Sequence, residues 1–117
     1  MTKTYRELVD GAKSRIKEVG TGEVQAMADA TIVDVREDAE WDQGHLPGAM
    51  HLSRGVLEYR VEKLLPDKDA PIVLYCGGGG RSALAADVLQ QMGYTNVCSL
   101  AGGLRGWTAA GLPTEKE

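Results

Sequence analysis

The stretch from Pro71 to Ala86 constrains the fold of this 117-residue chain more strongly than any other. Ile72–Tyr75 is a short apolar run rich in strand formers, which is typical of a strand covered on both faces. Four consecutive glycines follow Cys76 and open backbone conformations that are closed to other residues. Beyond Arg81, apolar residues recur at helical spacing. The stretch therefore predicts a buried strand, a glycine loop and a helix in immediate succession.

Cys76 stands where the predicted strand meets the loop, and its surroundings favour a reactive thiolate. The positive end of the following helix and the Arg81 cation would both stabilise a negatively charged sulfur. Inward-pointing N–H groups of the glycine loop would form a small anion-binding nest. A buried, inert cysteine beside a flexible turn is the alternative, because buried free cysteines are common. The combination of loop, arginine and cysteine favours a nucleophile whose sulfur, or a group attached to it, is held as an anion.

The rest of the chain alternates between predicted strands and helices. Strands are expected near residue 19 and at 31–35, 49–52, 72–75 and 97–100. Helices are expected at 5–17, 21–28, 37–43, 53–65, 82–92 and 104–110. This alternation predicts an α/β fold, with a five-stranded, mainly parallel sheet and helices on both faces. Ligands of such sheets bind at the carboxyl ends of the strands, where Asp34, Arg36 and Cys76 would lie.

Composition limits the classes of function. The net charge of −4 argues against nucleic acid as a partner. Because we find neither an apolar run long enough for a membrane span nor a signal-peptide pattern, we expect no membrane association and a cytoplasmic location. In a reducing compartment the two cysteines, Cys76 and Cys98, are expected to be free thiols. No Cys/His cluster has the spacing of metal ligands, and no metal or organic cofactor is expected.

Three motifs resemble those of the rhodanese (sulfurtransferase) family. The pattern C-x-x-G-x-R-S from Cys76 resembles the active-site loop of that family. The pattern D-V-R from Asp34, followed by E-W-x-x-G-H-L-P-G-A from Glu40, resembles its upstream motif. The pattern A-G-G-L-x-x-W from Ala101 resembles its closing motif. The resemblance implies a rhodanese-like fold and divides the chain into an N-terminal helical extension, residues 1–18, and a rhodanese-like domain, residues 19–117.

The resemblance also implies a double displacement at Cys76. Its thiolate would attack the outer sulfur of a donor such as thiosulfate and become a persulfide, and a thiol or cyanide acceptor would then take that sulfur. A protein persulfide is a further class of donor. Arg36 and Arg60 are candidates for the substrate pocket, although an ion pair with Asp34 or another carboxylate is favoured for Arg36 and solvent exposure for Arg60. The loop that binds the persulfide would comprise Gly77, Gly78, Gly79, Gly80, Arg81 and Ser82, with Arg81 assisting electrostatically.

Two other functions stay open at this point. The domain could be a persulfide carrier or a partner-binding module in sulfur trafficking, since a carrier needs the same loop, although the retained Cys76 argues against a degenerate binding module. Cysteine phosphatases and arsenate reductases also place a cysteine before a loop that ends in arginine, with five residues between the two. Here four residues separate Cys76 from Arg81. The shorter loop suits a single sulfur atom better than a tetrahedral oxyanion.

Two further residues are interpreted as structural. His45 lies in a Gly/Pro turn and lacks a spaced acidic partner, so we expect no catalytic role for it. Cys98 lies in an apolar strand and is expected to be a core residue, with a resolving thiol for Cys76 as the alternative.

Overall fold

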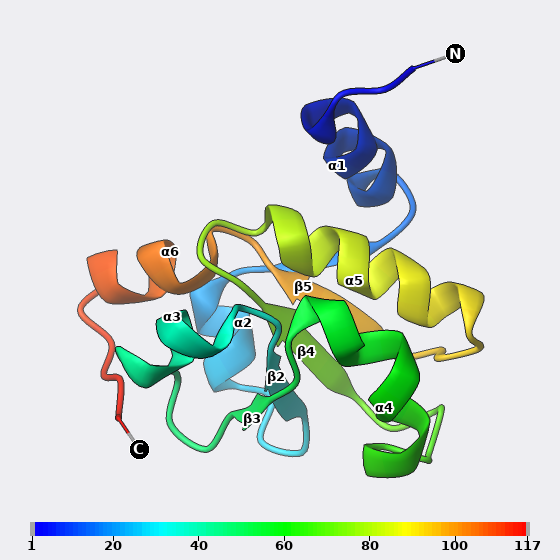
Figure 1. The fold of residues 1–117 in the computed structure, drawn as a ribbon. Helices are drawn as coiled ribbons and strands as arrows, with labels where there is room; N and C mark the ends of the chain where they lie inside the picture. The colour runs from blue at the N-terminus through cyan, green and yellow to red at the C-terminus, as the bar shows by residue number, and fades with distance from the viewer. Residues whose placement is uncertain (1, 117) are drawn as a thin grey trace.

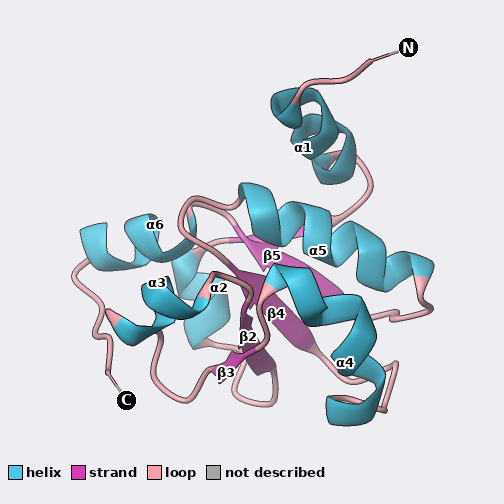
Figure 2. Ribbon diagram, viewed as in Figure 1, coloured by secondary structure: helices cyan, strands magenta, loops and turns pink. Residues whose placement is uncertain are grey.

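The computed structural model describes residues 2–116, which form one parallel sheet enclosed by helices (Figures 1 and 2). The order of the strands across the sheet is β1-β5-β4-β2-β3, and all four pairings are parallel. The predicted α/β fold, a five-stranded sheet with helices, is therefore confirmed. The strands are β1 (Lys17–Val19), β2 (Thr31–Asp34), β3 (Met50–His51), β4 (Ile72–Tyr75) and β5 (Val97–Leu100).

Helices cover both faces of the sheet, and each face has its own apolar cluster. On one face, α4 and α5 bury Leu57 and Leu89 against the strands. On the other, α2 and α6 bury Val24 and Trp107. The helices are α2 (Thr21–Gln25), α3 (Asp38–Asp42), α4 (Leu57–Leu64), α5 (Gly80–Gln91) and α6 (Gly103–Ala109), with a short 3₁₀ turn at Arg54–Val56 before α4.

The central strand β4 is covered on both sides. Ile72 and Leu74 point into the cluster under α4 and α5, whereas Val73 and Tyr75 point into the cluster under α2 and α6. None of the four is more than 1% exposed. A continuous apolar run without polar alternation is what such a doubly covered parallel strand requires. Because β4 is so firmly enclosed, the residue that follows it is held at a fixed point on the carboxyl edge of the sheet.

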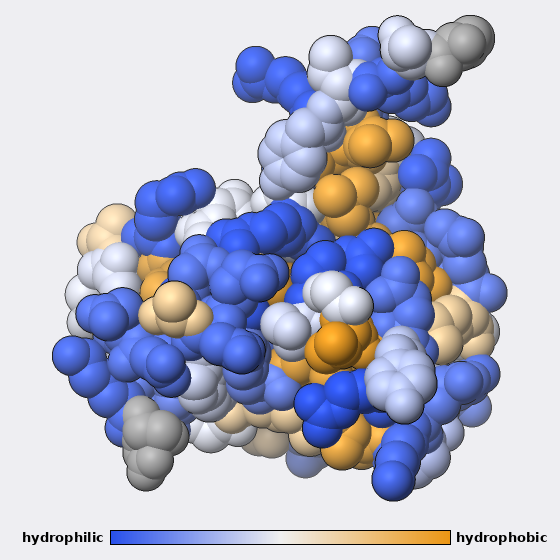
Figure 3. Space-filling model, viewed as in Figure 1, coloured by the Kyte–Doolittle hydropathy of each residue, from blue (hydrophilic) through white to orange (hydrophobic). Residues whose placement is uncertain are grey.

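The first helix, α1 (Tyr5–Lys13), lies outside these layers and packs on α5 (Figure 1). It buries Val9 and Ala12, and Arg15 just beyond it binds Asp87 of α5 with Nε 2.9 Å from Oδ1. In Figure 3, apolar side chains gather where α1 meets the rest of the molecule. The helix α1 and Arg15 are thus attached to α5 by both apolar contact and an ion pair.

Several predicted element boundaries differ from those observed by a few residues, and for two of them the structure shows the cause. The helix expected at residues 5–17 ends at Lys13, because Lys17 already pairs with Cys98 and needs extended backbone. As a result, β1 crosses the boundary predicted between the N-terminal extension, residues 1–18, and the domain, residues 19–117. The helix expected from residue 82 begins at Gly80, because Gly79, with φ +102°, caps it in the left-handed conformation. Within residues 2–116, no helix is both long and apolar enough to cross a membrane.

Candidate active site

Cys76 follows β4 directly and lies at the carboxyl edge of the sheet, where the glycine loop turns the chain into α5. Its exposed fraction is 1%. The strand fixes Cys76 from one side, and the first turn of α5 approaches its sulfur from the other. The carboxyl edge of a parallel sheet, facing a helix N-terminus, is the position at which anionic groups are bound in such folds.

Polar hydrogens converge on the Cys76 sulfur. Sγ accepts hydrogen bonds from the backbone N–H of Gly79 at 3.1 Å and of Ser82 at 3.4 Å. The Ser82 hydroxyl lies 3.5 Å from Sγ and 2.8 Å from the hydroxyl of Ser99 on β5. Because both hydroxyls are buried, Ser99 holds Ser82 in place beside the sulfur. The loop predicted as an anion-binding nest therefore surrounds the sulfur with donors.

These contacts decide the ionisation of the thiol. Burial is the largest single influence and raises the pKa of Cys76. The hydrogen bonds from the Ser82 hydroxyl and from the N–H groups of Ser82, Gly79 and Gly78 act in the opposite direction. Together they outweigh burial, so the pKa of Cys76 lies below its ordinary value. A thiolate is the nucleophilic form of cysteine, and this site stabilises it.

The N-terminus of α6 holds the loop from the other side. The N–H of Leu104 donates to the carbonyl of Cys76 at 2.8 Å, and the N–H of Arg105 donates to the carbonyl of Gly77 at 3.0 Å. Gly103, with φ +54°, makes this approach possible, since a Cβ there would collide with the Cys76 carbonyl oxygen. The two glycines of the closing motif thus allow backbone-to-backbone contact between α6 and the active-site loop.

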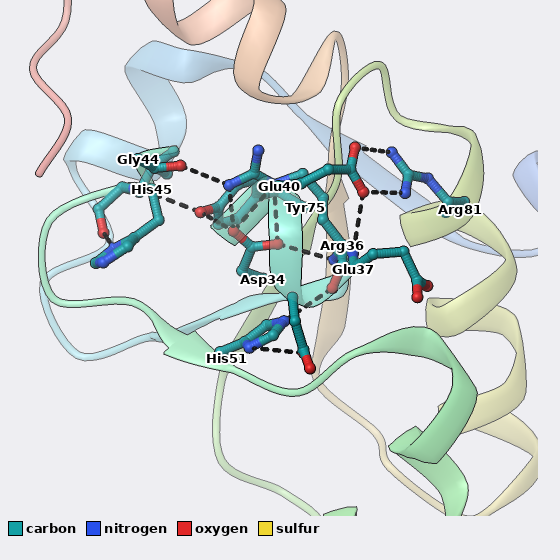
Figure 4. Close-up of polar contacts among 11 residues, drawn as sticks. Asp34, Arg36, Glu37, Glu40, Gly44, His45, His51, Tyr75 and Arg81 are labelled. Carbon is teal, nitrogen blue, oxygen red and sulfur yellow. Dashed lines mark hydrogen bonds and ion pairs between the residues drawn. The ribbon is translucent and has the colours of Figure 1, made fainter. Parts of the chain in front are cut away.

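Arg81 is engaged in an ion pair (Figure 4). Its Nη1 and Nη2 lie 2.7 and 3.0 Å from the two carboxylate oxygens of Glu40 on α3. The hydrogen bond from Arg81 is the main reason that the pKa of Glu40 falls to about 2. A Cβ on Gly77 would be 3.3 Å from Nη2 of Arg81, which shows that the guanidinium also lies over the loop. Arg81 therefore stands beside the loop as expected, but Glu40 compensates much of its charge.

A model of the Rhodanese-like domain family matches residues 17–110 of the chain. The chain belongs to the rhodanese-like family. The resemblance in its three motifs is thereby confirmed. A sulfurtransferase of Allochromatium vinosum is 39% identical over 85 residues, which cover 73% of this chain and 78% of that protein. The thiosulfate sulfurtransferase GlpE of Coxiella burnetii is 34% identical over 95 residues, which cover 81% and 87%.

A solved structure from Rhodopseudomonas palustris extends the likeness to almost the whole chain. It matches this rhodanese-like chain with a TM-score of 0.90 at 34% identity, covering 98% of this chain and 96% of that one. That protein is described as one of unknown function and a possible tyrosine phosphatase. The fold of the chain is therefore that of the family, with α1 inside the matched region.

Arg36, one of the two candidates for the substrate pocket, is buried in an ion pair (Figure 4). Its Nη2 lies 2.8 Å from Oδ2 of Asp34 and 2.6 Å from the carbonyl oxygen of Gly44. Tyr75 donates from its hydroxyl to the same Asp34 oxygen at 2.5 Å. This geometry matches the ion pair that the sequence favoured for Arg36.

Arg60, the other candidate, is exposed on α4. It lines a surface hollow with Tyr59, Lys63 and Leu64. None of these residues belongs to the loop that follows Cys76. The solvent exposure that the sequence favoured for Arg60 is what the structure has.

Cys98 and His45 both lie among buried residues of the rhodanese-like domain. Cys98 pairs in register with Val73, three residues before Cys76, which puts the two cysteines about 10 Å apart along the strands. Burial raises the pKa of Cys98. His45 stacks on Trp41 with ring centroids 3.5 Å apart. Both fit the structural interpretation.

Three residues around the site are not among the site residues predicted from the sequence: Glu40, Ser99 and Arg105. Glu40 and Arg81 are 41 positions apart, and Ser99 and Ser82 are 17 apart, so only the folded chain brings them together. Arg105 occupies a variable position of the closing motif, directly after its two glycines and leucine. The signal that could have found Arg105 is its place in that motif, since α6 packs on the loop.

Proposed function

We propose that this rhodanese-like protein is a sulfurtransferase, which moves sulfane sulfur from a small donor such as thiosulfate to a thiophilic acceptor through a persulfide on Cys76. The observation that carries the proposal is the set of N–H groups, from Gly79 and Ser82, that converge on the Cys76 sulfur at the start of α5. The names of the Allochromatium and Coxiella relatives support sulfur transfer as the reaction class.

In the first half-reaction, the Cys76 thiolate attacks the outer sulfur of thiosulfate. A new sulfur–sulfur bond forms at Sγ while the bond to the sulfonate sulfur breaks, and sulfite leaves with that electron pair. The charge passes from Sγ to the transferred sulfur, so no proton moves. The N–H donors of the loop suit this step because they can stabilise negative charge on either sulfur.

In the second half-reaction, the acceptor attacks the terminal sulfur of the persulfide. With cyanide as acceptor, a carbon–sulfur bond forms, the sulfur–sulfur bond breaks, and thiocyanate leaves. The electron pair of the broken bond returns to Sγ, which restores the Cys76 thiolate. The lowered pKa of Cys76 favours this step as well, since a stabilised thiolate is a better leaving group.

The test is the intact mass of the protein after incubation with thiosulfate, and again after cyanide. We expect wild type to gain the mass of one sulfur atom and to lose it to cyanide with release of thiocyanate. Cys76→Ser should gain none, whereas the matched control Cys98→Ser should behave as wild type because Cys98 is buried away from the loop. A gain that persists in Cys76→Ser would contradict the assignment of the nucleophile.

Two further assays on the wild-type protein distinguish the proposed function from its alternatives. A persulfide carrier needs the same loop. It would gain sulfur from a cysteine desulfurase but not from thiosulfate.

A phosphatase is the alternative suggested by the description of the Rhodopseudomonas palustris structure, and it would hydrolyse p-nitrophenyl phosphate. The short loop and the engagement of Arg81 by Glu40 argue against phosphate binding. Hydrolysis of that ester without any sulfur uptake would overturn the proposal.

A further inference from the structure

The glycine loop carries no side chain that could recognise a charged substrate. Between Cys76 and Arg81 every residue is glycine, and Arg81 is held by both carboxylate oxygens of Glu40. A loop built in this way can stabilise a sulfur anion through its N–H groups, but it leaves the charge of the sulfur donor unmatched. The source of a cation for the donor must therefore be sought outside the loop.

Arg105 of α6 brings such a cation to the loop. Its backbone is anchored there, since its N–H donates to the carbonyl of Gly77 at 3.0 Å. Its guanidinium lies against Gly78, where a Cβ would collide with Nη2 and would lie 3.2 Å from Cζ. A Cβ on Gly77 would lie 3.9 Å from Nη1. The Arg105 side chain thus occupies the space that a side chain at position 78 would fill.

The Arg105 guanidinium has donors to spare. Among residues 2–116, no carboxylate pairs with it and no hydrogen bond from its side chain is present, and the residue is exposed. Arg81, its neighbour across Gly77, is by contrast paired at 2.7 Å. An exposed guanidinium presents a fork of five N–H donors that suits a planar or tetrahedral oxyanion. The N–H of Gly78, against which the guanidinium lies, also helps to lower the pKa of Cys76.

We propose that Arg105 is a specificity-determining residue that binds the anionic part of the sulfur donor, so that the site selects small anionic donors whose leaving group is an oxyanion. The glycine at position 78 is what admits the guanidinium to this place. The inference rests on the proposed function for its substrate, but the binding of an anion beside Cys76 is a property that can be tested without sulfur transfer.

The first test compares two alkylating agents of equal size that differ in charge. Iodoacetate and iodoacetamide both form a sulfur–carbon bond with the Cys76 thiolate and release iodide, and only the former carries a carboxylate. In a Cys98→Ser background, Arg105→Gln should slow the alkylation of Cys76 by iodoacetate by about fivefold or more. The rate with iodoacetamide should change by less than about twofold. Because both reagents need the thiolate, their ratio is independent of any change in the pKa of Cys76.

The controls separate local binding from net charge. Arg105→Lys keeps a cation and should retain most of the preference for iodoacetate. Lys13→Gln removes one charge at the end of α1, where Lys13 pairs with Glu18 at 3.6 Å, and should leave the ratio unchanged. If Lys13→Gln and Arg105→Gln lowered the ratio of the iodoacetate rate to the iodoacetamide rate equally, the proposal would be overturned. The effect would then come from the net charge of the protein and not from local binding.

The second test uses thiosulfate itself. Arg105→Gln should raise KM for thiosulfate by about tenfold with a smaller change in kcat, and added sulfite, the oxyanion product, should inhibit this variant less than wild type. An unchanged alkylation ratio and an unchanged KM would overturn the role of Arg105 and leave the proposed function intact. If wild type takes no sulfur from any donor, the proposed function fails, while the alkylation ratio still decides whether Arg105 binds anions beside Cys76.

Discussion

At the scale of single residues, hydrogen bonds rather than a bare ion pair stabilise the Cys76 thiolate. Burial opposes ionisation, and the donors that reverse its effect are the Ser82 hydroxyl and three backbone N–H groups. Three of the four donors belong to the peptide backbone and survive most substitutions. Ser82 therefore provides the one side-chain donor of these four, and it is itself oriented by Ser99.

Ser82→Ala should raise the pKa of Cys76, because it removes the hydroxyl while leaving the N–H donors in place. The rate of alkylation by iodoacetamide should fall by about tenfold at pH values below the wild-type midpoint and converge with wild type once both thiols are ionised. The measurement is the rate as a function of pH. Ser99→Ala is the matched control, since it leaves the Ser82 hydroxyl present, and it should shift the midpoint less. Superimposed profiles of wild type and Ser82→Ala would contradict this account.

At the scale of elements, the site is assembled from segments that are separate in the chain. Cys76 comes from the end of β4, the N–H donors from the start of α5, and the clamp on the loop from α6. The helix α3 takes part through Glu40, whose pair with Arg81 joins it to α5. The loop is therefore held at several points, which suits a rigid binding site for a small anion.

The Glu40–Arg81 pair should make the stability of the protein depend on pH. The pKa of Glu40 falls from 4.5 to about 2 on folding, so the pair stabilises the folded state fully above pH 4.5 and loses this effect as the pH falls toward 2. The difference in free energy of unfolding between wild type and Glu40→Gln should shrink over that range, measured by urea denaturation at a series of pH values. Glu58→Gln, which removes a carboxylate from α4, is the control. A difference that stays constant with pH would exclude this linkage.

At the scale of the whole molecule, a buried polar network connects the centre of the sheet to the turn before β3. Asp34 of β2 binds Arg36 and the hydroxyl of Tyr75 of β4, and that hydroxyl accepts from the N–H of Leu46 at 3.1 Å. Burial is the main reason that the pKa of Tyr75 is raised, so the hydroxyl stays protonated as a donor to Asp34. The network lies on the face of β4 away from α5 and stabilises the edge that carries the site.

Tyr75→Phe should destabilise the protein by about 1–3 kcal/mol, because it leaves the N–H of Leu46 and an oxygen of Asp34 without this partner in a buried place. Urea denaturation measures the loss. Tyr94→Phe serves as the comparison. Within residues 2–116 the Tyr94 hydroxyl makes one hydrogen bond, to the carbonyl of Leu65 at 2.7 Å, so this substitution should lower the stability less. Equal stability of Tyr75→Phe and wild type would show that the network relaxes around the missing hydroxyl.

Features that depend on neighbouring residues could be predicted from the sequence. The apolar run of β4, the glycines after Cys76 and the helical pattern beyond them lie in one continuous stretch, so strand, loop and helix could be predicted together with the reactive cysteine. The alternation of such stretches was enough to predict the parallel α/β sheet, because parallel strands need crossover connections. Individual ends of helices were less predictable, as at Lys13, where pairing of β1 with β5 decides the end of α1.

Which side chains share the site depends on how the elements pack. Glu40 compensates Arg81 and Arg105 lies against Gly78 because α3 and α6 pack beside the loop. Neither contact was predicted, since the partners are many positions apart and a lone charged residue is ordinarily solvated. Local sequence can fix a backbone conformation through steric limits at each residue, whereas the electrostatic environment of Cys76 depends on how whole elements pack against one another.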